Sequence, residues 1–232
     1  MLNELRAQVC EANRSLERHG LLKLTWGNVS GIDRPSGAVA IKPSGVPYAD
    51  LQPSDIVLVN LDGKIVEGKL RPSSDTPTHL ALYRAFAGIG GVTHTHSTYA
   101  TMFAQALRGI PCLGTTHADN FHGEVPVTRP MTRAEVESDY EANTGKVIVE
   151  RFAGMNPAEM PAVLVASHGP FTWGTDAADS VTNSVVVEEC AKMALGTFNL
   201  HPEMPPIPGF LLDKHFRRKH GSGAYYGQGG SH

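Results

Sequence analysis

Apolar residues recur along the first twenty positions with the spacing of a helix. Leu5, Val9, Ala12 and Leu16 form one stripe, and Gly20 follows as a typical C-terminal cap. We therefore predict an amphipathic helix that packs its apolar stripe against the rest of the chain.

Short apolar runs follow, separated by Gly, Pro and Asp. The Asp62-Gly63 pair between two of these runs is a hairpin signal, so the neighbouring strands are expected to be antiparallel. The predicted extended segments are 21–30, 38–41, 56–60 and 64–67.

Helical and extended patterns alternate in the second half. Thr76 with Pro77 predicts a helix start, and Thr132 with Glu135 three residues later is a capping-box signature. The remaining predicted elements are strands at 91–96 and 162–167 and helices at 176–195, ending near Gly196, and at 211–220. The pattern predicts a single α/β domain with a largely antiparallel central β-sheet flanked by helices.

Composition narrows the functional class. Of 232 residues, 41% are apolar and 19% charged, which is typical of one globular domain. The net charge of −3 and the scattered Lys and Arg residues argue against nucleic-acid binding. No apolar run approaches the roughly 20 residues that span a bilayer, and the three cysteines are far apart and odd in number. We expect a cytoplasmic protein with neither a nucleic-acid nor a membrane partner.

Three histidines at predicted strand ends are candidate metal ligands. Side chains alternate along a strand, so His94 and His96 point to one face, about 6 to 7 Å apart along the backbone. Taken alone, this pair is equally compatible with two solvated residues at a strand end. His168 follows a second buried run directly and is a candidate for the third nitrogen of a catalytic metal site with open positions, although a lone histidine at a strand end is more often structural.

Three segments combine small residues with hydrogen-bond donors: 26–30, 42–45 and 72–75. Small residues let backbone N–H groups approach an anion, Lys42 adds a positive charge, and 72–75 precedes a helix N-terminus. Each segment alone is more often an ordinary turn. Together they indicate a phosphate site.

Possible proton carriers lie elsewhere in the chain. Asp75, Asp119, His215 and the pair Tyr225-Tyr226 all have suitable groups. The alternative interpretation is that Asp119 is a turn residue and that Tyr226 belongs to an irregular tail.

Seven segments, in this order along the chain, resemble segments of a known protein family. They are LTWGNVS, IKPSGV, PSSDTPTHL, THTHS, GTTHAD, SHGPFTWG and LLDKHFRRKHG…AYYGQ. Together they resemble the class II aldolase family and, within it, the L-ribulose-5-phosphate 4-epimerases. The resemblance covers residues 1–228, and 229–232 falls outside it as a C-terminal extension.

The resemblance implies the family's antiparallel α/β fold, a homotetramer, and Zn²⁺ or another divalent ion such as Mn²⁺ at a subunit boundary. It also implies three sets of site residues. The metal ligands would be Asp75, His94, His96 and His168. The groups that hold the substrate and its phosphate would be Gly27, Asn28, Lys42, Ser44, Gly45, Ser73 and Ser74. The acid/base pair would be Asp119 and Tyr226, with His215 assisting.

The implied reaction interconverts L-ribulose 5-phosphate and D-xylulose 5-phosphate, as in arabinose catabolism. Retro-aldol cleavage of C3–C4 would give a metal-bound enediolate of dihydroxyacetone and glycolaldehyde phosphate, and closure on the other aldehyde face would invert C4. Related epimerases in other pathways, such as ascorbate use, stay open.

Two other functions are compatible with the same family. One is an aldolase of the fuculose or rhamnulose 1-phosphate type, but such aldolases tend to carry Glu at the position of Asp75. The other is a non-catalytic, adducin-like interaction module, which is expected to lose the metal histidines that this chain keeps.

Overall fold

A single seven-stranded sheet forms the centre of the protein. The structure, a computed structural model, describes residues 2–220, 224 and 225. The strand order is β4-β3-β2-β1-β5-β7-β6, and each adjacent pair is antiparallel, which confirms the predicted fold class. The strands are β1 (Gly27–Asp33), β2 (Ala38–Ile41), β3 (Val57–Val59), β4 (Ile65–Glu67), β5 (Gly91–Thr95), β6 (Ala162–Leu164) and β7 (Pro170–Gly174).

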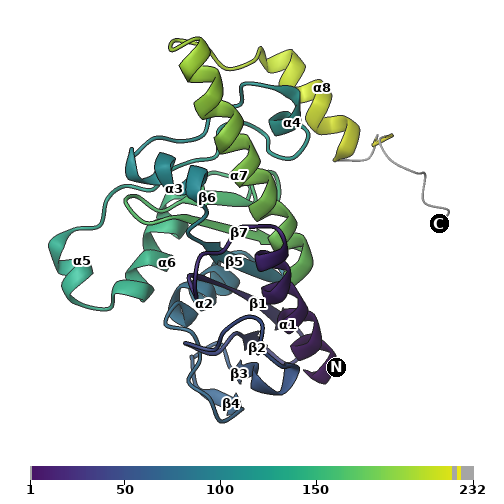
Figure 1. Cartoon of the computed structure of the whole chain (residues 1–232), viewed down its shortest axis with the longest axis vertical. Coiled ribbons are helices and arrows are strands. Elements are labelled where there is room, and N and C mark those ends of the chain that lie inside the picture. The colour runs from purple at the N-terminus through teal and green to yellow at the C-terminus, as the bar shows by residue number, and fades with distance from the viewer. Residues whose placement is uncertain (1, 221–223, 226–232) are drawn as a thin grey trace.

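Helices cover both faces of this sheet (Figure 1). Helices α1 and α7 contact β1 and each other on one face, whereas α2 and α6 pack together on the opposite face. The helices are α1 (Leu2–Arg18), α2 (Thr76–Ala85), α3 (Thr98–Gln105), α4 (Thr115–Ala118), α5 (Arg133–Glu137), α6 (Tyr140–Arg151), α7 (Ala177–Leu200) and α8 (Gly209–Lys219), with a short 3₁₀ helix η1 (Pro53–Asp55).

The alternation of side chains along the strands divides the core in two. In β3, Val57 and Val59 belong to the apolar cluster beneath α2 and α6, and Leu58 belongs to the cluster beneath α1. All three side chains are fully buried. The sheet is therefore packed on both sides, which makes its strand ends a rigid support for a site.

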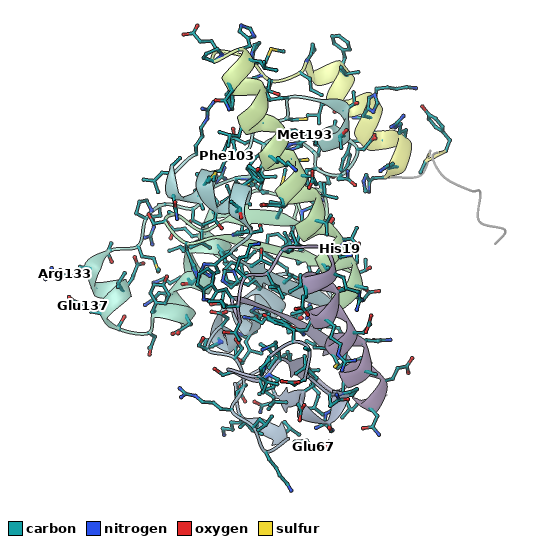
Figure 2. The ribbon with its side chains drawn as sticks, in the orientation of Figure 1. His19, Glu67, Phe103, Arg133, Glu137 and Met193 are labelled. Atoms are coloured by element: carbon teal, nitrogen blue, oxygen red, sulfur yellow. The ribbon has the colours of Figure 1, made fainter. Side chains whose placement is uncertain are left out.

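Several local predictions are confirmed. The Asp62-Gly63 turn joins β3 and β4 as an antiparallel pair, with Gly63 at a positive φ of 83°. Thr132 and Glu135 form the expected capping box at the start of α5. Figure 2 shows two further residues of α5, Arg133 and Glu137, at the outer edge of the molecule.

Other boundaries differ from the prediction. Asp75, not Thr76, occupies the cap position of α2, and it makes no side-chain capping bond there. Helix α7 continues beyond Gly196 to Leu200, because a single glycine in a long helix costs only about 1 kcal/mol. Strand β6 ends at Leu164, because the chain turns at 165–168 to reach β7.

Helix α6 was not predicted from the sequence. Its sequence contains Gly145, which weakens the helical pattern. A side chain there would lie 2.5 Å from the Cβ atom of Ala81 in α2, so the glycine permits close packing of the two helices. Tertiary packing therefore outweighs local propensity in this segment.

Helices α4 and α8 lie together beyond one end of the sheet (Figure 1). The chain reaches α8 through the proline-rich segment 202–208, which is irregular as expected. Within the described residues, no helix is long and apolar enough to cross a membrane.

Candidate metal and substrate site

Three histidines converge at the end of strands β5 and β6. One nitrogen from each of His94, His96 and His168 lies within 4.8 Å of the others. Their ring centroids are 4.7 to 4.9 Å apart. The ends of the two predicted strands therefore lie close together, at the same end of the sheet.

Strand pairing fixes the position of His94. In the sheet register His94 lies between Asn28 of β1 and Phe171 of β7. Its ring stacks on Phe171 at 4.2 Å, and its Nδ1 is 3.0 Å from the carbonyl oxygen of Pro170. Because this contact places the ring proton on Nδ1, the Nε2 lone pair is left to face the other two histidines.

A tight turn presents His168. The backbone N–H of His168 donates to the carbonyl of Val165, and Ser167 adopts a positive φ of 60°. Gly169 follows, and a Cβ atom there would lie 2.7 Å from the carbonyl oxygen of Thr95. The absence of a side chain at Gly169 thus lets the turn that carries His168 approach β5 closely.

Helix α7 anchors the segment that follows His96. The Glu188 carboxylate accepts backbone N–H bonds of 2.9 Å from Tyr99 and Ala100, in the first turn of α3. The cap residue Ser97 makes no side-chain capping bond itself. The carboxylate of Glu188, which is distant in the sequence, therefore fixes the chain three residues beyond His96.

Burial keeps two of the three imidazoles, those of His96 and His168, neutral. Burial lowers the pKa of His96 to about 4 and that of His168 to about 3, with a contribution from His94 in both cases. Burial also lowers the pKa of the nearby His79 to about 3. Neutral imidazole is the form that binds a metal ion.

A carboxylate lies beside the histidines without joining the tight cluster. The Asn28 side chain donates from Nδ2 to Asp75 Oδ2 at 2.6 Å. Burial acts to raise the pKa of Asp75, but His94 and the Asn28 hydrogen bond outweigh it and lower the pKa. Asp75 is therefore ionised at neutral pH.

These residues fit a divalent ion. Three histidine nitrogens and a neighbouring carboxylate match the donors that zinc and related ions accept in catalytic sites. The Nδ1 atom of His168 is buried without a hydrogen-bond partner among the described residues, which is costly unless a bound group compensates. The cluster also opens into a pocket, which leaves room for a substrate.

The three segments predicted to bind an anion, 26–30, 42–45 and 72–75, contribute residues to that same pocket, of about 420 Å³. Lys42 is almost fully buried, its Nζ donates to the carbonyl oxygen of Val46 at 2.7 Å, and it lies over the Tyr48 ring. The Tyr48 hydroxyl donates to the carbonyl of Gly27, so Tyr48 contacts both Lys42 and the segment 26–30. Burial lowers the pKa of Lys42 to about 8.

Eleven residues singled out from the sequence line this one pocket. They are Gly27, Asn28, Lys42, Ser44, Gly45, Ser73, Ser74, Asp75, His94, His96 and His168. Trp26 and Pro43, which belong to the predicted segments 26–30 and 42–45, also line it, and the sequence interpretation missed three further lining residues, which are Thr25, Tyr140 and Glu141. Thr25 directly precedes the predicted segment 26–30, so widening that segment by one residue finds it.

Asp119 and His215 lie outside this pocket and form a cluster of their own. Arg218 holds the Asp119 carboxylate with two hydrogen bonds of 2.9 and 2.6 Å, and His215 Nδ1 is 3.0 Å from it. Burial acts to raise the pKa of Asp119, but the Arg218 and His215 hydrogen bonds outweigh it and lower the pKa. Tyr226 lies outside the described residues.

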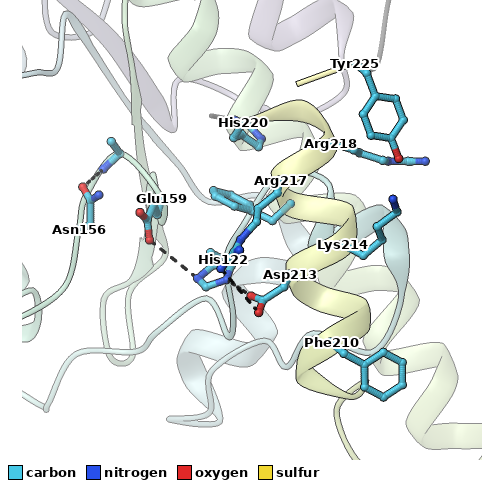
Figure 3. Close-up of a pocket in the computed structure, with 12 residues that line it drawn as sticks. His122, Asn156, Glu159, Phe210, Asp213, Lys214, Arg217, Arg218, His220 and Tyr225 are labelled. Carbon is cyan, nitrogen blue, oxygen red and sulfur yellow. Dashed lines mark hydrogen bonds and ion pairs between the residues drawn. The ribbon is translucent and has the colours of Figure 1, made fainter. Parts of the chain in front are cut away.

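A second and larger hollow of about 900 Å³ adjoins α8 (Figure 3). There the His122 ring is 2.8 Å from the Asp213 carboxylate and 3.8 Å from Glu159. Arg218 lines this hollow as well as holding Asp119. Its size exceeds that of the metal pocket, but none of the residues predicted from the sequence as metal ligands or phosphate binders lines it.

Comparison with known proteins defines the class. Residues 7–195 match the family described as the Class II Aldolase and Adducin N-terminal domain. The chain belongs to this family.

Close relatives carry one name. The chain is 54% identical over 227 residues to "L-ribulose-5-phosphate 4-epimerase UlaF" of Salmonella paratyphi B, and 55% identical to the protein of that name from Salmonella paratyphi C. Each match covers 98% of this chain and 100% of the relative.

Solved structures share the fold. An "L-fuculose 1-phosphate aldolase" matches with a TM-score of 0.78 and 27% identity, covering 93% of this chain and 95% of the other. YgbL from Escherichia coli, described as a putative aldolase/epimerase/decarboxylase, matches with a TM-score of 0.73 and 26% identity over 92% and 98% of the two chains.

Proposed function

We propose that the protein is a divalent-metal-dependent 4-epimerase that interconverts L-ribulose 5-phosphate and D-xylulose 5-phosphate. One observation carries the proposal: the three-histidine cluster and the three anion-binding segments line a single pocket. The name shared by relatives that match over their whole length supports the choice of substrate.

The anion-binding segments would hold the phosphate end of the sugar. Backbone N–H groups around Ser44, Gly45, Ser73 and Ser74 and the Lys42 ammonium suit a phosphate dianion. This grip would also keep the phosphorylated fragment in place after the C3–C4 bond breaks, so that the bond can form again.

The metal would lie at the opposite end of the substrate. A Zn²⁺ or Mn²⁺ ion held by His94, His96 and His168 would act as a Lewis acid toward the substrate oxygen that gains negative charge. Asn28 would orient Asp75, which we propose as a fourth ligand in the resting site.

Proton transfer would require a second copy of the chain. Asp119 and His215 do not line the metal pocket of their own chain. We therefore propose a homotetramer in which Asp119, His215 and Tyr226 of one chain complete the pocket of another. Proton carriers on the two sides of the aldehyde would serve the two epimers in turn. A cytoplasmic location and a role in arabinose catabolism belong to the same proposal.

A class II aldolase acting on fuculose or rhamnulose 1-phosphate is the second candidate. The fold match to an L-fuculose 1-phosphate aldolase favours it. The carboxylate at position 75 is the shorter Asp, however, and a base that must reach a substrate carbon is better served by Glu.

A product assay separates the two functions. Purified protein loaded with Zn²⁺ or Mn²⁺ is given L-ribulose 5-phosphate, and D-xylulose 5-phosphate and glycolaldehyde phosphate are both measured. We expect the epimer to accumulate without free glycolaldehyde phosphate. Release of the fragment, or turnover of L-fuculose 1-phosphate alone, would support the aldolase instead.

A further inference from the structure

Tyr48 is a buried residue that lies just outside the metal pocket. It belongs to the loop between β2 and η1 and is only 4% exposed. It does not line the pocket, but it contacts two residues that do, Gly27 and Lys42. No step of the proposed reaction uses it. A buried side chain between two residues of a pocket can nevertheless control where both of them lie.

The ring of Tyr48 stabilises a buried ammonium group. Lys42 Nζ donates to the carbonyl oxygens of Val46 at 2.7 Å and Pro43 at 3.2 Å, and no carboxylate among the described residues pairs with it. The centroid of the Tyr48 ring lies 4.5 Å from Nζ. A buried charge is costly unless its neighbours compensate, and the negative face of an aromatic ring attracts a cation. A phosphate in the pocket would be the counter-ion that this ammonium group lacks.

The hydroxyl of Tyr48 fixes the ring in place. It donates to the carbonyl oxygen of Gly27, the first residue of β1, at 2.5 Å. Burial and the charge of Asp75 raise the pKa of this hydroxyl, so it keeps the proton that it donates. Gly27 is itself confined, because it pairs with Thr95 in the sheet and a Cβ atom there would lie 2.8 Å from the carbonyl oxygen of His94. The ring is therefore anchored to the packed sheet.

Tyr48 also connects the three segments predicted to bind an anion. A backbone hydrogen bond of 3.0 Å, from the N–H of residue 73 to the carbonyl of residue 42, joins the segments 72–75 and 42–45. The two contacts of Tyr48 join 42–45 to the remaining segment, 26–30. The position of the ammonium group relative to the other segments therefore depends on this side chain.

We propose that Tyr48 is a positioning residue for the phosphate end of the pocket: its ring holds the Lys42 ammonium group where the phosphate binds, and its hydroxyl anchors the ring to Gly27. The inference rests on the proposed phosphate site and extends it to a residue that does not touch the substrate. Its test is therefore the affinity for phosphate, measured without turnover.

Two substitutions separate the ring from the hydroxyl. Tyr48→Phe keeps the ring beside Lys42, whereas Tyr48→Leu removes the ring and the hydroxyl together. We expect the dissociation constant of inorganic phosphate to rise about 10- to 30-fold in Tyr48→Leu, because the buried cation loses its aromatic partner. It should rise less than about threefold in Tyr48→Phe, which loses only the anchoring hydrogen bond.

A third variant changes the charge distribution of the ring and keeps its shape. Replacement of Tyr48 by pentafluorophenylalanine withdraws electrons from the ring face, so it should weaken phosphate binding well beyond the effect of Tyr48→Phe. Because it retains the packing of a ring, it tests the contact with the ammonium group even where Tyr48→Leu fails to fold. Thermal unfolding identifies any variant that fails to fold.

Two controls separate positioning from packing. In the Lys42→Met background, Tyr48→Leu should weaken phosphate binding less than about twofold further, because the group on which Tyr48 acts is already gone. Tyr83→Leu is the matched control elsewhere in the core. Tyr83 is also buried and also lies beside a cation, Arg34, at 5.6 Å, but neither of these two residues lines the pocket. We expect unchanged phosphate binding from Tyr83→Leu.

Calorimetric titration of inorganic phosphate into the metal-loaded protein, and into the metal-ligand variant His96→Asn, distinguishes the two proposals. If phosphate does not bind to the wild type, or is not bound by His96→Asn, the proposed phosphate site is wrong and the role of Tyr48 is overturned with it. If both bind phosphate and folded Tyr48→Leu binds it as tightly as the wild type, only the role of Tyr48 is overturned. An undiminished effect of Tyr48→Leu in the Lys42→Met background would also overturn that role, because it would trace the effect to packing.

Discussion

The two regions that carry titratable clusters are supported differently. The metal pocket lies on β1, β5 and the β6–β7 turn, where strand pairing fixes His94 between Asn28 and Phe171. The Asp119 cluster lies beyond the sheet, and side chains of α8 hold it, chiefly Arg218 and His215. The backbone thus preorganises one cluster, whereas charge and hydrogen bonds between side chains organise the other.

This difference is consistent with the separate tasks that we propose for the two regions. A metal site needs ligands held rigidly, and the packed sheet provides that. A proton carrier must approach the substrate, and Asp119 does not reach the pocket of its own chain. Variants that disable one region and leave the other intact therefore test whether the two regions have separate tasks.

The largest losses of activity are expected from one substitution in each cluster, and the metal content of the two variants should differ. His96→Asn should lose the metal and lower activity by at least about 10³-fold, because it removes a ligand of the Lewis acid. Asp119→Asn should keep the metal and lower activity by about 10²- to 10⁴-fold, because it removes a proton carrier. Metal content and kcat are measured on the same preparations.

Asp213→Asn is a matched control for Asp119→Asn. Asp213 also pairs with a histidine, His122, but it lies in the second hollow. We expect near wild-type activity from this variant. Full activity in Asp119→Asn, or metal loss in it, would contradict the division of tasks.

A smaller effect concerns the phosphate end of the pocket. Burial lowers the pKa of Lys42 to about 8, so its ammonium loses its charge as the pH rises through that value. Because the substrate phosphate stays a dianion there, kcat/KM should fall about tenfold per pH unit above pH 8. Lys42→Met should have a higher KM and lack this decline. A variant that keeps the same decline would show that another group causes it.

Strand periodicity explains why the metal cluster was predictable. His94 and His96 share a face because side chains alternate, and antiparallel pairing brings β7 and the turn bearing His168 beside them. The part of the pocket that α6 lines with Tyr140 and Glu141 was not predictable, because the packing of α6 depends on the contact of Gly145 with α2.

The sequence could not show which pocket Asp119 serves. In the proposed oligomer, Asp119 completes the pocket of another copy of the chain, and the sequence of one chain does not show how copies pack. The role predicted for Tyr226 remains a prediction, since that residue is outside the described part of the chain.

Mixing two inactive variants tests the central claim most directly. Chains with His96→Asn keep Asp119, and chains with Asp119→Asn keep the metal ligands. If each site combines the pocket of one chain with the Asp119 cluster of another, an equal mixture reassembled at random should recover about a quarter of wild-type activity. No recovery in oligomers shown to contain both chains would contradict the shared site.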